Sequence, residues 1–287
     1  MLKLCNSMNM KTKYIFLSVW AVVLAFTMTS CDSFLNQPPY DDFTDEEYWQ
    51  NEDQARTYMY GFYTSVFAGY GTGTSHGPFL MGQTLNDDFA SDVEQKDLTP
   101  LVVPETDGSW SFSNIRKANY ALASIERIDA TPAAKNHWRG VARFFRACYY
   151  SNLVFRYGDV PWYDRVPKLS DRKEDMDYLY KDRDPRAFVD SCIMADFQYA
   201  MDSVRENDGP MHINRYVVAA MASRFMLREG TFLKYHNIDA HLAEQCLTMA
   251  KGAAEVVMKS NKYAIAPSYN ALFTSEDLGS NPEIIMH

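Results

Sequence analysis

The sequence has little that would let it cross a membrane or bind nucleic acid. Its longest apolar run covers only residues 14–26, whereas a membrane-spanning helix needs about 20 apolar residues. Mean hydropathy is -0.34, which excludes a protein with many membrane spans. Basic residues number 28 and acidic residues 37, giving a net charge of -9. Nucleic-acid binding depends on neutralising phosphates, so we expect no nucleic-acid partner.

Recognisable catalytic patterns are also missing. The chain contains no HExxH, GxSxG or P-loop pattern. His236 and His241 are five residues apart, which does not place them on one helix face. Asp87 and Asp88 are adjacent and would point apart, whereas glycoside hydrolysis needs two carboxyls about 5–9.5 Å apart. We therefore predict a protein that is not an enzyme and needs no cofactor or metal.

Cysteine is scarce, with five in 287 residues and no CxxC pair. Cys5 lies in the leader segment described below, which leaves Cys31, Cys148, Cys192 and Cys246. The last three fall in segments with helical periodicity and show no metal-ligand spacing. We expect them to be free thiols that pack as small apolar side chains.

The N-terminal segment is typical of an export signal. Three lysines precede the apolar run, and Met28-Thr29-Ser30 then leads to Cys31. This order is similar to the cleavage site of bacterial lipoproteins, which predicts a signal peptide over residues 1–30 and lipid on Cys31. A plain secretory signal with an incidental cysteine is the alternative. Removal of residues 1–30 takes three lysines and no acid, so the net charge becomes -12.

Lipid on Cys31 would need more than one acyl chain, because a single chain anchors only marginally. Residues 31–43 contain Pro38-Pro39 and several acids, and we interpret them as an extended tether. Residues 44–287 form the predicted folded domain.

Helical periodicity dominates this domain. Thr44 and Glu47 have the spacing of a capping box, which predicts a helix over 45–68. Thr131-Pro132 and Asp184-Pro185 each have a capping residue before a proline at the first helical position. Further helices are expected around 115–125, 131–158, 184–204, 214–234 and 240–258. We expect an all-α fold, an irregular tetratricopeptide-like array of helical pairs.

Two segments depart from this pattern. Residues 69–108 are rich in Gly, Thr and Ser and are predicted to form a long ordered loop, a class that is often functional. Residues 281–287 have the pattern of a strand that begins without a partner. An isolated strand is not stable, so we interpret the chain as truncated at its C-terminus.

Several stretches together resemble the SusD/RagB family of outer-membrane glycan-binding lipoproteins of Bacteroidota. The most specific is WRGVARFFRACYYSNLVFRYGDVPW at 138–162. It contains the spaced arginines, the tyrosine pair and the Gly-Asp-Val-Pro turn that are typical of the family. Supporting stretches are FLNQPP, YWQNEDQARTYMYGFY, WSFSNIRKANYALASIERI and YNALFTSEDLGSNPEIIMH.

The resemblance implies a fold and a function. Members of the family are lipid-anchored at the outer membrane, face the cell exterior, and cover a SusC-like TonB-dependent transporter. They capture oligosaccharides, or in some members peptides, and deliver them without catalysis. The family continues for a comparable length beyond the end of this chain, and that second half holds much of the ligand surface.

Candidate ligand-binding residues follow from the chemistry of sugar recognition. Flat aromatic faces stack on sugar rings, and carboxylates, amides or guanidinium groups hold hydroxyls. Asp87, Asp88 and Trp110 lie in or beside the long polar loop, and the corresponding loop in the family often contributes to the sugar site. The alternatives are helix capping or loop hydrogen bonding for Asp87 and Asp88, and burial between helices for Trp110.

Other conspicuous side chains are better explained by packing. Trp49, Trp138 and Trp162 are expected in the core. Three arginines share one helix face, at 139, 143 and 146, and could bind an anion. Pairing with acids of a neighbouring helix is the preferred interpretation, with Glu126, Asp129 and Asp196 as candidate partners.

A second function remains open. A helical-repeat adaptor lipoprotein would bind protein or peptide in its groove and have no glycan site. Exposed aromatic side chains favour the first function, and burial of Trp110 against the helices favours the second.

The lipid anchor can be tested directly. Cys31→Ala removes the only thiol that could carry the lipid, so we expect the protein to move from the membrane fraction to the soluble fraction after cell lysis. Cys192→Ala serves as the control and should stay with the membrane. Membrane retention of Cys31→Ala at the wild-type level would contradict the lipoprotein interpretation.

Overall fold

The computed structural model describes residue 14 and residues 48–67, 108–167, 170, 172–274 and 279–286. Contacts divide the chain into Met1–Tyr48 and Trp49–His287, and the fold below is that of the second unit. Cys31, the tether, the Thr44–Glu47 pattern, Asp87, Asp88 and almost all of the predicted 69–108 loop lie outside the described residues.

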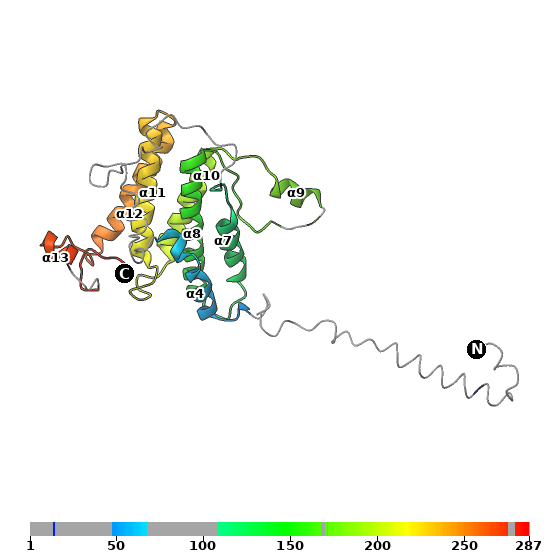
Figure 1. Ribbon diagram of the computed structural model, residues 1–287, viewed down its shortest axis with the longest axis horizontal. Coiled ribbons are helices and arrows are strands. Elements are labelled where there is room, and N and C mark those ends of the chain that lie inside the picture. The colour runs from blue at the N-terminus through cyan, green and yellow to red at the C-terminus, as the bar shows by residue number, and fades with distance from the viewer. Residues whose placement is uncertain are drawn as a thin grey trace, which may run out of the picture. The chain divides into compact units, whose positions relative to one another are not determined.

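The described residues of the second unit contain helices, two isolated bridges and no strand. The helices are α4 (Glu52–Tyr60), α5 (Tyr63–Val66), α7 (Ser113–Ser124), α8 (Pro132–Tyr157), α9 (Lys173–Leu179), α10 (Arg186–Ser203), α11 (Arg215–Tyr235), α12 (Ala240–Lys259) and α13 (Tyr269–Thr274) (Figure 1). The predicted all-α class is confirmed. The predicted C-terminal strand is wrong for residues 281–286, which form turns, with the Ala264 amide bonded to the Pro282 carbonyl.

The long helices pack as antiparallel neighbours in the order α7, α8, α10, α11 and α12 (Figure 1). Arg139 in the first half of α8 reaches Glu126 just beyond the end of α7. Arg186 at the start of α10 reaches Glu229 near the end of α11. These contacts make the helical-pair array that the sequence predicted.

The predicted caps at both ends of α8 are confirmed. Thr131 accepts from the Ala134 amide and is followed by Pro132, as predicted. Gly158 ends α8 with φ 74°, a conformation that glycine adopts without a Cβ penalty. Asn214 and Asp239 cap α11 and α12 in the same way as Thr131 caps α8. The short helices α9 and α13 were not predicted.

Two helix starts were predicted wrongly. The continuous helix over 45–68 is wrong within the described residues, because Asn51 and Gln54 form a capping box that starts α4, and Gly61 ends it. Asp184 is not a helix cap. Its carboxylate accepts from the Trp162 amide, and Asp159 from the preceding turn accepts from the first amide of α10.

The core is aromatic and closely packed. Phe62, Phe144, Phe145 and Phe197 are each at most 2% exposed. The prediction that three tryptophans pack in the core is confirmed, since the exposures of Trp49, Trp138 and Trp162 are 2%, 3% and 8%. The three described cysteines are free thiols as predicted, and Cys148 and Cys246 are buried while Cys192 is half-buried.

Small residues let the helices approach closely. A Cβ at Gly140 of α8 would lie 2.8 Å from the Val204 side chain, and one at Gly230 of α11 would lie 2.7 Å from Leu247 of α12. Both distances are shorter than van der Waals contact, so glycine at these positions sets the spacing of the α8/α10 and α11/α12 pairs.

Arg146 is the centre of a buried polar cluster. Its Nε and Nη2 donate to the two carboxylate oxygens of Asp196 at 2.7 and 2.8 Å, and its Nη1 donates to Asn119 at 2.7 Å. The side chains of Arg146 and Asp196 are 6% and 3% exposed. The cluster joins α7, α8 and α10. Arg143 lies 3.6 Å from Asp196, and Arg139 pairs with Glu126, so the predicted pairing of the three arginines with acids is confirmed.

Removal of one partner of the Arg146–Asp196 pair should be costly, because the other is left charged in the core. We expect Arg146→Ala to lower the free energy of unfolding by about 3–5 kcal/mol. The double variant Arg146→Met/Asp196→Leu should recover most of that loss, since no buried charge remains. Urea denaturation measures both.

Arg139→Ala is the control for this comparison, because its pair with Glu126 is exposed and worth about 0–1 kcal/mol. An equal loss of unfolding free energy in Arg139→Ala and Arg146→Ala would contradict the prediction that breaking a buried ion pair costs more than breaking an exposed one.

A second buried cluster places two carboxyls against one guanidinium. Asp190 of α10 and Glu229 of α11 are 1% and 4% exposed. Arg186 lies 2.5 Å from Glu229 and 3.9 Å from Asp190. Burial, reinforced by the charge of Glu229 and only partly offset by Arg186, raises the pKa of Asp190 to about 8. Asp190 therefore holds a proton at neutral pH.

This raised pKa predicts a pH dependence of stability. The folded chain keeps a proton on Asp190 that the unfolded chain releases above about pH 4, so stability should fall as pH rises from about 4 to above 8. Asp190→Asn cannot ionise. The free energy of unfolding is measured by urea denaturation at pH 5 and at pH 9. Between these two pH values it should fall by about 1–3 kcal/mol more in wild type than in Asp190→Asn. Asp202→Asn, at an exposed position of α10, is the control and should show the same change of unfolding free energy with pH as wild type. The same change in Asp190→Asn as in wild type would contradict the raised pKa of Asp190.

Candidate ligand-binding site

Trp110 lies at the surface, in the segment that precedes α7. The side chain is 37% exposed, so it is neither buried between helices nor fully open to solvent. Its indole contacts the ring of Tyr157, the last residue of α8, with a centroid distance of 4.9 Å and planes at 86°. Phe112 contacts the indole in a similar edge-to-face way at 5.4 Å. Such pairs hold aromatic rings in a fixed relative orientation.

The position of Trp110 depends on the buried cluster. Phe112 packs edge-to-face on Tyr163 at 5.5 Å. The Tyr163 amide donates to the hydroxyl of Tyr150, and its carbonyl accepts from Asn119 of the Arg146 cluster at 2.8 Å. The surface indole is thus connected to the core through a continuous series of contacts.

A guanidinium covers part of the Trp110 ring. The Cζ atom of Arg183 lies 4.7 Å from the indole centroid, in cation–π geometry. The next residue, Asp184, fixes Arg183 in place, because its amide donates to the Val160 carbonyl and its carboxylate accepts from the Trp162 amide. Tyr157 directly precedes the Gly-Asp-Val-Pro-Trp turn at 158–162, and Arg183 precedes Asp184, which bonds to this turn, so the turn brings both residues to Trp110.

An open cleft of about 630 Å³ lies beside this aromatic pair. Its lining combines hydroxyl, amide, aromatic and guanidinium groups: Ser65, Ser109, Ser111, Ser113, Asn114, Tyr149, Asn152, Leu153, Phe155, Arg156 and Tyr157. The Ser65 and Tyr149 hydroxyls are 2.5 Å apart. Burial raises the pKa of Tyr149 to about 12, so its phenol stays neutral and can donate a hydrogen bond. Asn152 accepts from Arg228 at 3.2 Å through its side-chain oxygen.

The cleft has the chemistry of a saccharide site. Aromatic rings offer apolar faces, and hydroxyl and amide groups both donate and accept hydrogen bonds. We name the cleft together with Trp110 and Arg183 the aromatic cleft.

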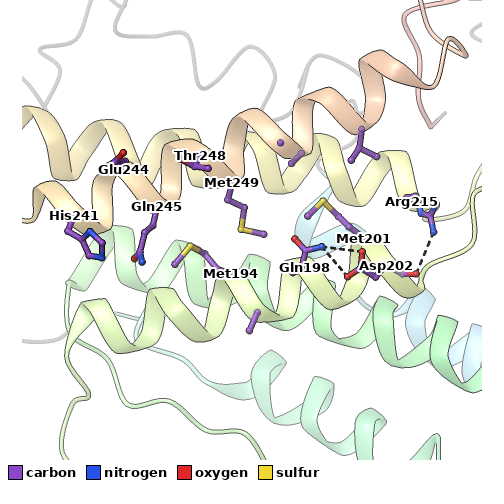
Figure 2. Close-up of a pocket in the computed structure, with 14 residues that line it drawn as sticks. Met194, Gln198, Met201, Asp202, Arg215, His241, Glu244, Gln245, Thr248 and Met249 are labelled. Carbon is purple, nitrogen blue, oxygen red and sulfur yellow. Dashed lines mark hydrogen bonds between the residues drawn. The ribbon is translucent and has the colours of Figure 1, made fainter.

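A second groove runs between α10 and α12 and differs in character (Figure 2). Its volume is about 1080 Å³, and Met194, Met201 and Met249 project into it with the amides of Gln198 and Gln245. None of the described residues that line it is a Trp, Tyr or Phe. Flexible thioethers adapt to irregular apolar shapes, so this methionine groove suits an apolar peptide face better than a sugar ring.

The structure brings together one of the predicted site residues with several that were not predicted. Trp110 lies beside the cleft through its contact with the lining residue Tyr157, while Asp87 and Asp88 lie outside the described residues. Sequence reasoning missed Tyr157 and Arg183, which are 47 and 73 residues from Trp110. Tyr157 could have been found from the sequence, because it ends a long predicted helix directly before Gly158, where a side chain often reaches the surface. No local signal pointed to Arg183.

Among the described residues, no group of three or more His, Cys, Asp or Glu side chains is arranged to hold a metal ion. The searched part of the chain also contains no helix that is long and apolar enough to span a membrane.

Known proteins share this fold and sequence pattern. A SusD-like family model, described as starch-binding and associating with the outer membrane, matches residues 82–227. SusD-like protein P38 of Formosa agariphila is 23% identical over 243 residues, which is 77% of this chain and 47% of that protein. The chain spans about half the length of this relative.

Solved structures agree with the sequence match. A SusD-like protein of Bacteroides fragilis aligns with 87% of this chain and 47% of its own, with a TM-score of 0.60 and 19% identity. A SusD-like carbohydrate binding protein of the same species aligns with 83% of this chain and 46% of its own, also at TM-score 0.60, with 16% identity. These likenesses show the helical fold, and the family model covers half of the sequence: the chain belongs to the SusD-like family.

Proposed function

We propose that this protein captures oligosaccharides at the outer surface of the cell and delivers them to a SusC-like TonB-dependent transporter, without catalysing a reaction on them. Family membership supports glycan binding in general. A related structure from Bacteroides fragilis is itself described as a carbohydrate binding protein. The signal sequence and Cys31 support a lipid anchor at the outer membrane.

The aromatic cleft is the observation that carries the proposal. A partly exposed indole and a phenol meet at right angles beside a cleft that is rich in hydroxyl and amide groups. The two rings offer apolar faces and the cleft beside them offers hydrogen-bond partners, which is the combination that sugar recognition needs. A sugar ring stacked against this pair would place its hydroxyls against the serine and asparagine side chains of the cleft.

Trp110→Ala tests this site. Loss of the indole removes the stacking surface, and we expect affinity to fall by about 5–30-fold, equivalent to about 1–2 kcal/mol. Affinity electrophoresis of the full chain against a panel of polysaccharides identifies the ligand, and calorimetry then compares the variant with wild type. Trp110→Phe should retain part of the affinity, because a smaller ring still stacks.

Tyr235→Ala is the matched control, since that tyrosine is 76% exposed at the end of α11 and lies outside the aromatic cleft. It should bind as wild type does. Failure of the wild-type chain to bind any glycan of the panel would overturn the proposal.

The methionine groove supports one alternative function. A helical-repeat adaptor would bind an apolar peptide segment there and have no glycan site. Met194, Met201 and Met249 supply the adaptable apolar surface for such a segment. Peptide binding that is abolished by charged substitutions in this groove, together with absence of any glycan binding, would favour the alternative.

A further inference from the structure

The guanidinium of Arg183 lies on the Trp110 ring without a carboxylate partner among the described residues. Its one interaction there is with the indole, at 4.7 Å. A guanidinium carries five N–H donors, and none of those of Arg183 is hydrogen-bonded to a described residue. Arg183 is exposed, so these donors face the solvent beside the aromatic cleft.

Three of the four acids near Arg183 bond to other groups. Asp184 pairs with Lys181 and accepts from the Trp162 amide. Asp159 accepts from the first amide of α10, and Asp164 accepts from the Tyr178 hydroxyl. Asp182 is exposed, and no ion pair joins it to Arg183. Arg183 therefore has no carboxylate partner among the described residues, and its donors are available to a ligand.

A second guanidinium lies over the other ring of the pair. The Cζ atom of Arg156 is 5.9 Å from the Tyr157 centroid, and the same side chain lines the cleft. Each ring of the Trp110–Tyr157 pair therefore has a cation above it. The whole chain is acidic, with a net charge of -9. The two arginines beside these rings therefore carry the opposite sign to the chain as a whole. A carboxylate would form charge-assisted hydrogen bonds here that are stronger than those of a neutral hydroxyl.

We infer that the ligand of the aromatic cleft is an acidic saccharide, whose uronic acid carboxylate binds the N–H edge of Arg183 while a sugar ring packs against the Trp110–Tyr157 pair. A planar carboxylate matches the two parallel donors of a guanidinium, and such charge-assisted pairs are the stronger hydrogen bonds. The inference rests on the proposed function and adds the chemical class of the glycan.

The experiment uses pairs of polysaccharides that differ only in charge. Alginate, polygalacturonate and a glucuronic acid polymer are each compared with their carboxyl-reduced, neutral counterparts in affinity electrophoresis of the full chain. We expect at least one acidic polymer to bind 10-fold or more tightly than its neutral counterpart. That preference should shrink as NaCl rises from 50 to 300 mM, because salt screens exposed charges.

Three variants locate the effect. Arg183→Gln should lower affinity for the acidic polymer about 10-fold and leave affinity for the neutral counterpart unchanged. Arg183→Lys keeps the charge but loses the two-donor edge, and it should fall between wild type and Arg183→Gln. Lys251→Gln removes one positive charge from an exposed position of α12, outside the aromatic cleft, and should behave as wild type.

The outcomes separate the two proposals. Binding of neutral glycans alone, or equal binding of acidic and neutral counterparts, overturns the inference and leaves the proposed function standing. Equal binding of an acidic polymer by Arg183→Gln and wild type also overturns it. Absence of binding to every polymer overturns the proposed function itself. Binding of sulfated polymers in preference to uronic acid polymers counts against the carboxylate as the recognised group.

Discussion

The buried pair of Arg146 and Asp196 is the interaction on which the rest of the described fold depends. One guanidinium reaches a carboxylate of α10, an amide of α7 and a backbone carbonyl of the turn that follows α8. Its charge lies in the core, where an unpaired ion is costly, so the packing of α7, α8 and α10 that gives every donor a partner is favoured over other packings. The ring of Trp162 covers the guanidinium at 5.0 Å and completes its enclosure.

The same cluster connects the core to the surface. The turn after α8 is held by Tyr150, Asn119 and Arg146, and the residues on either side of this turn reach Trp110. Tyr157 contacts the indole directly, and Asp184, bonded to Val160 and Trp162, brings Arg183 over it. A rigid scaffold of this kind keeps the ring faces in place before a ligand arrives, which reduces the entropy lost on binding.

Two surfaces of the described chain therefore differ in what they can bind. The aromatic cleft combines flat rings, hydroxyls, amides and cations, which suits a glycan with acidic groups. The methionine groove combines flexible thioethers with polar and charged side chains, and none of its described lining residues offers an aromatic face (Figure 2). Flat aromatic faces stack on sugar rings, so the first surface fits a glycan-capture function better than the second.

The sequence by itself determined the helical class, the caps at both ends of α8 and the charge pairing of the three arginines. These features depend on local patterns, namely the 3.6-residue period, capping residues such as Thr131, and glycine with positive φ at 158. The sequence failed to predict two helix starts, because other residues offered the same kind of hydrogen bond. Asn51 caps α4 in place of Thr44, and Asp184 bonds to the Trp162 amide instead of capping α10. Only the tertiary structure decided which side chains surround Trp110. Tyr157 and Arg183 reach the indole because the segment after α8 and the segment before α10 meet at the Val160–Asp184 bridge, and no spacing within the sequence records a contact made between segments so far apart.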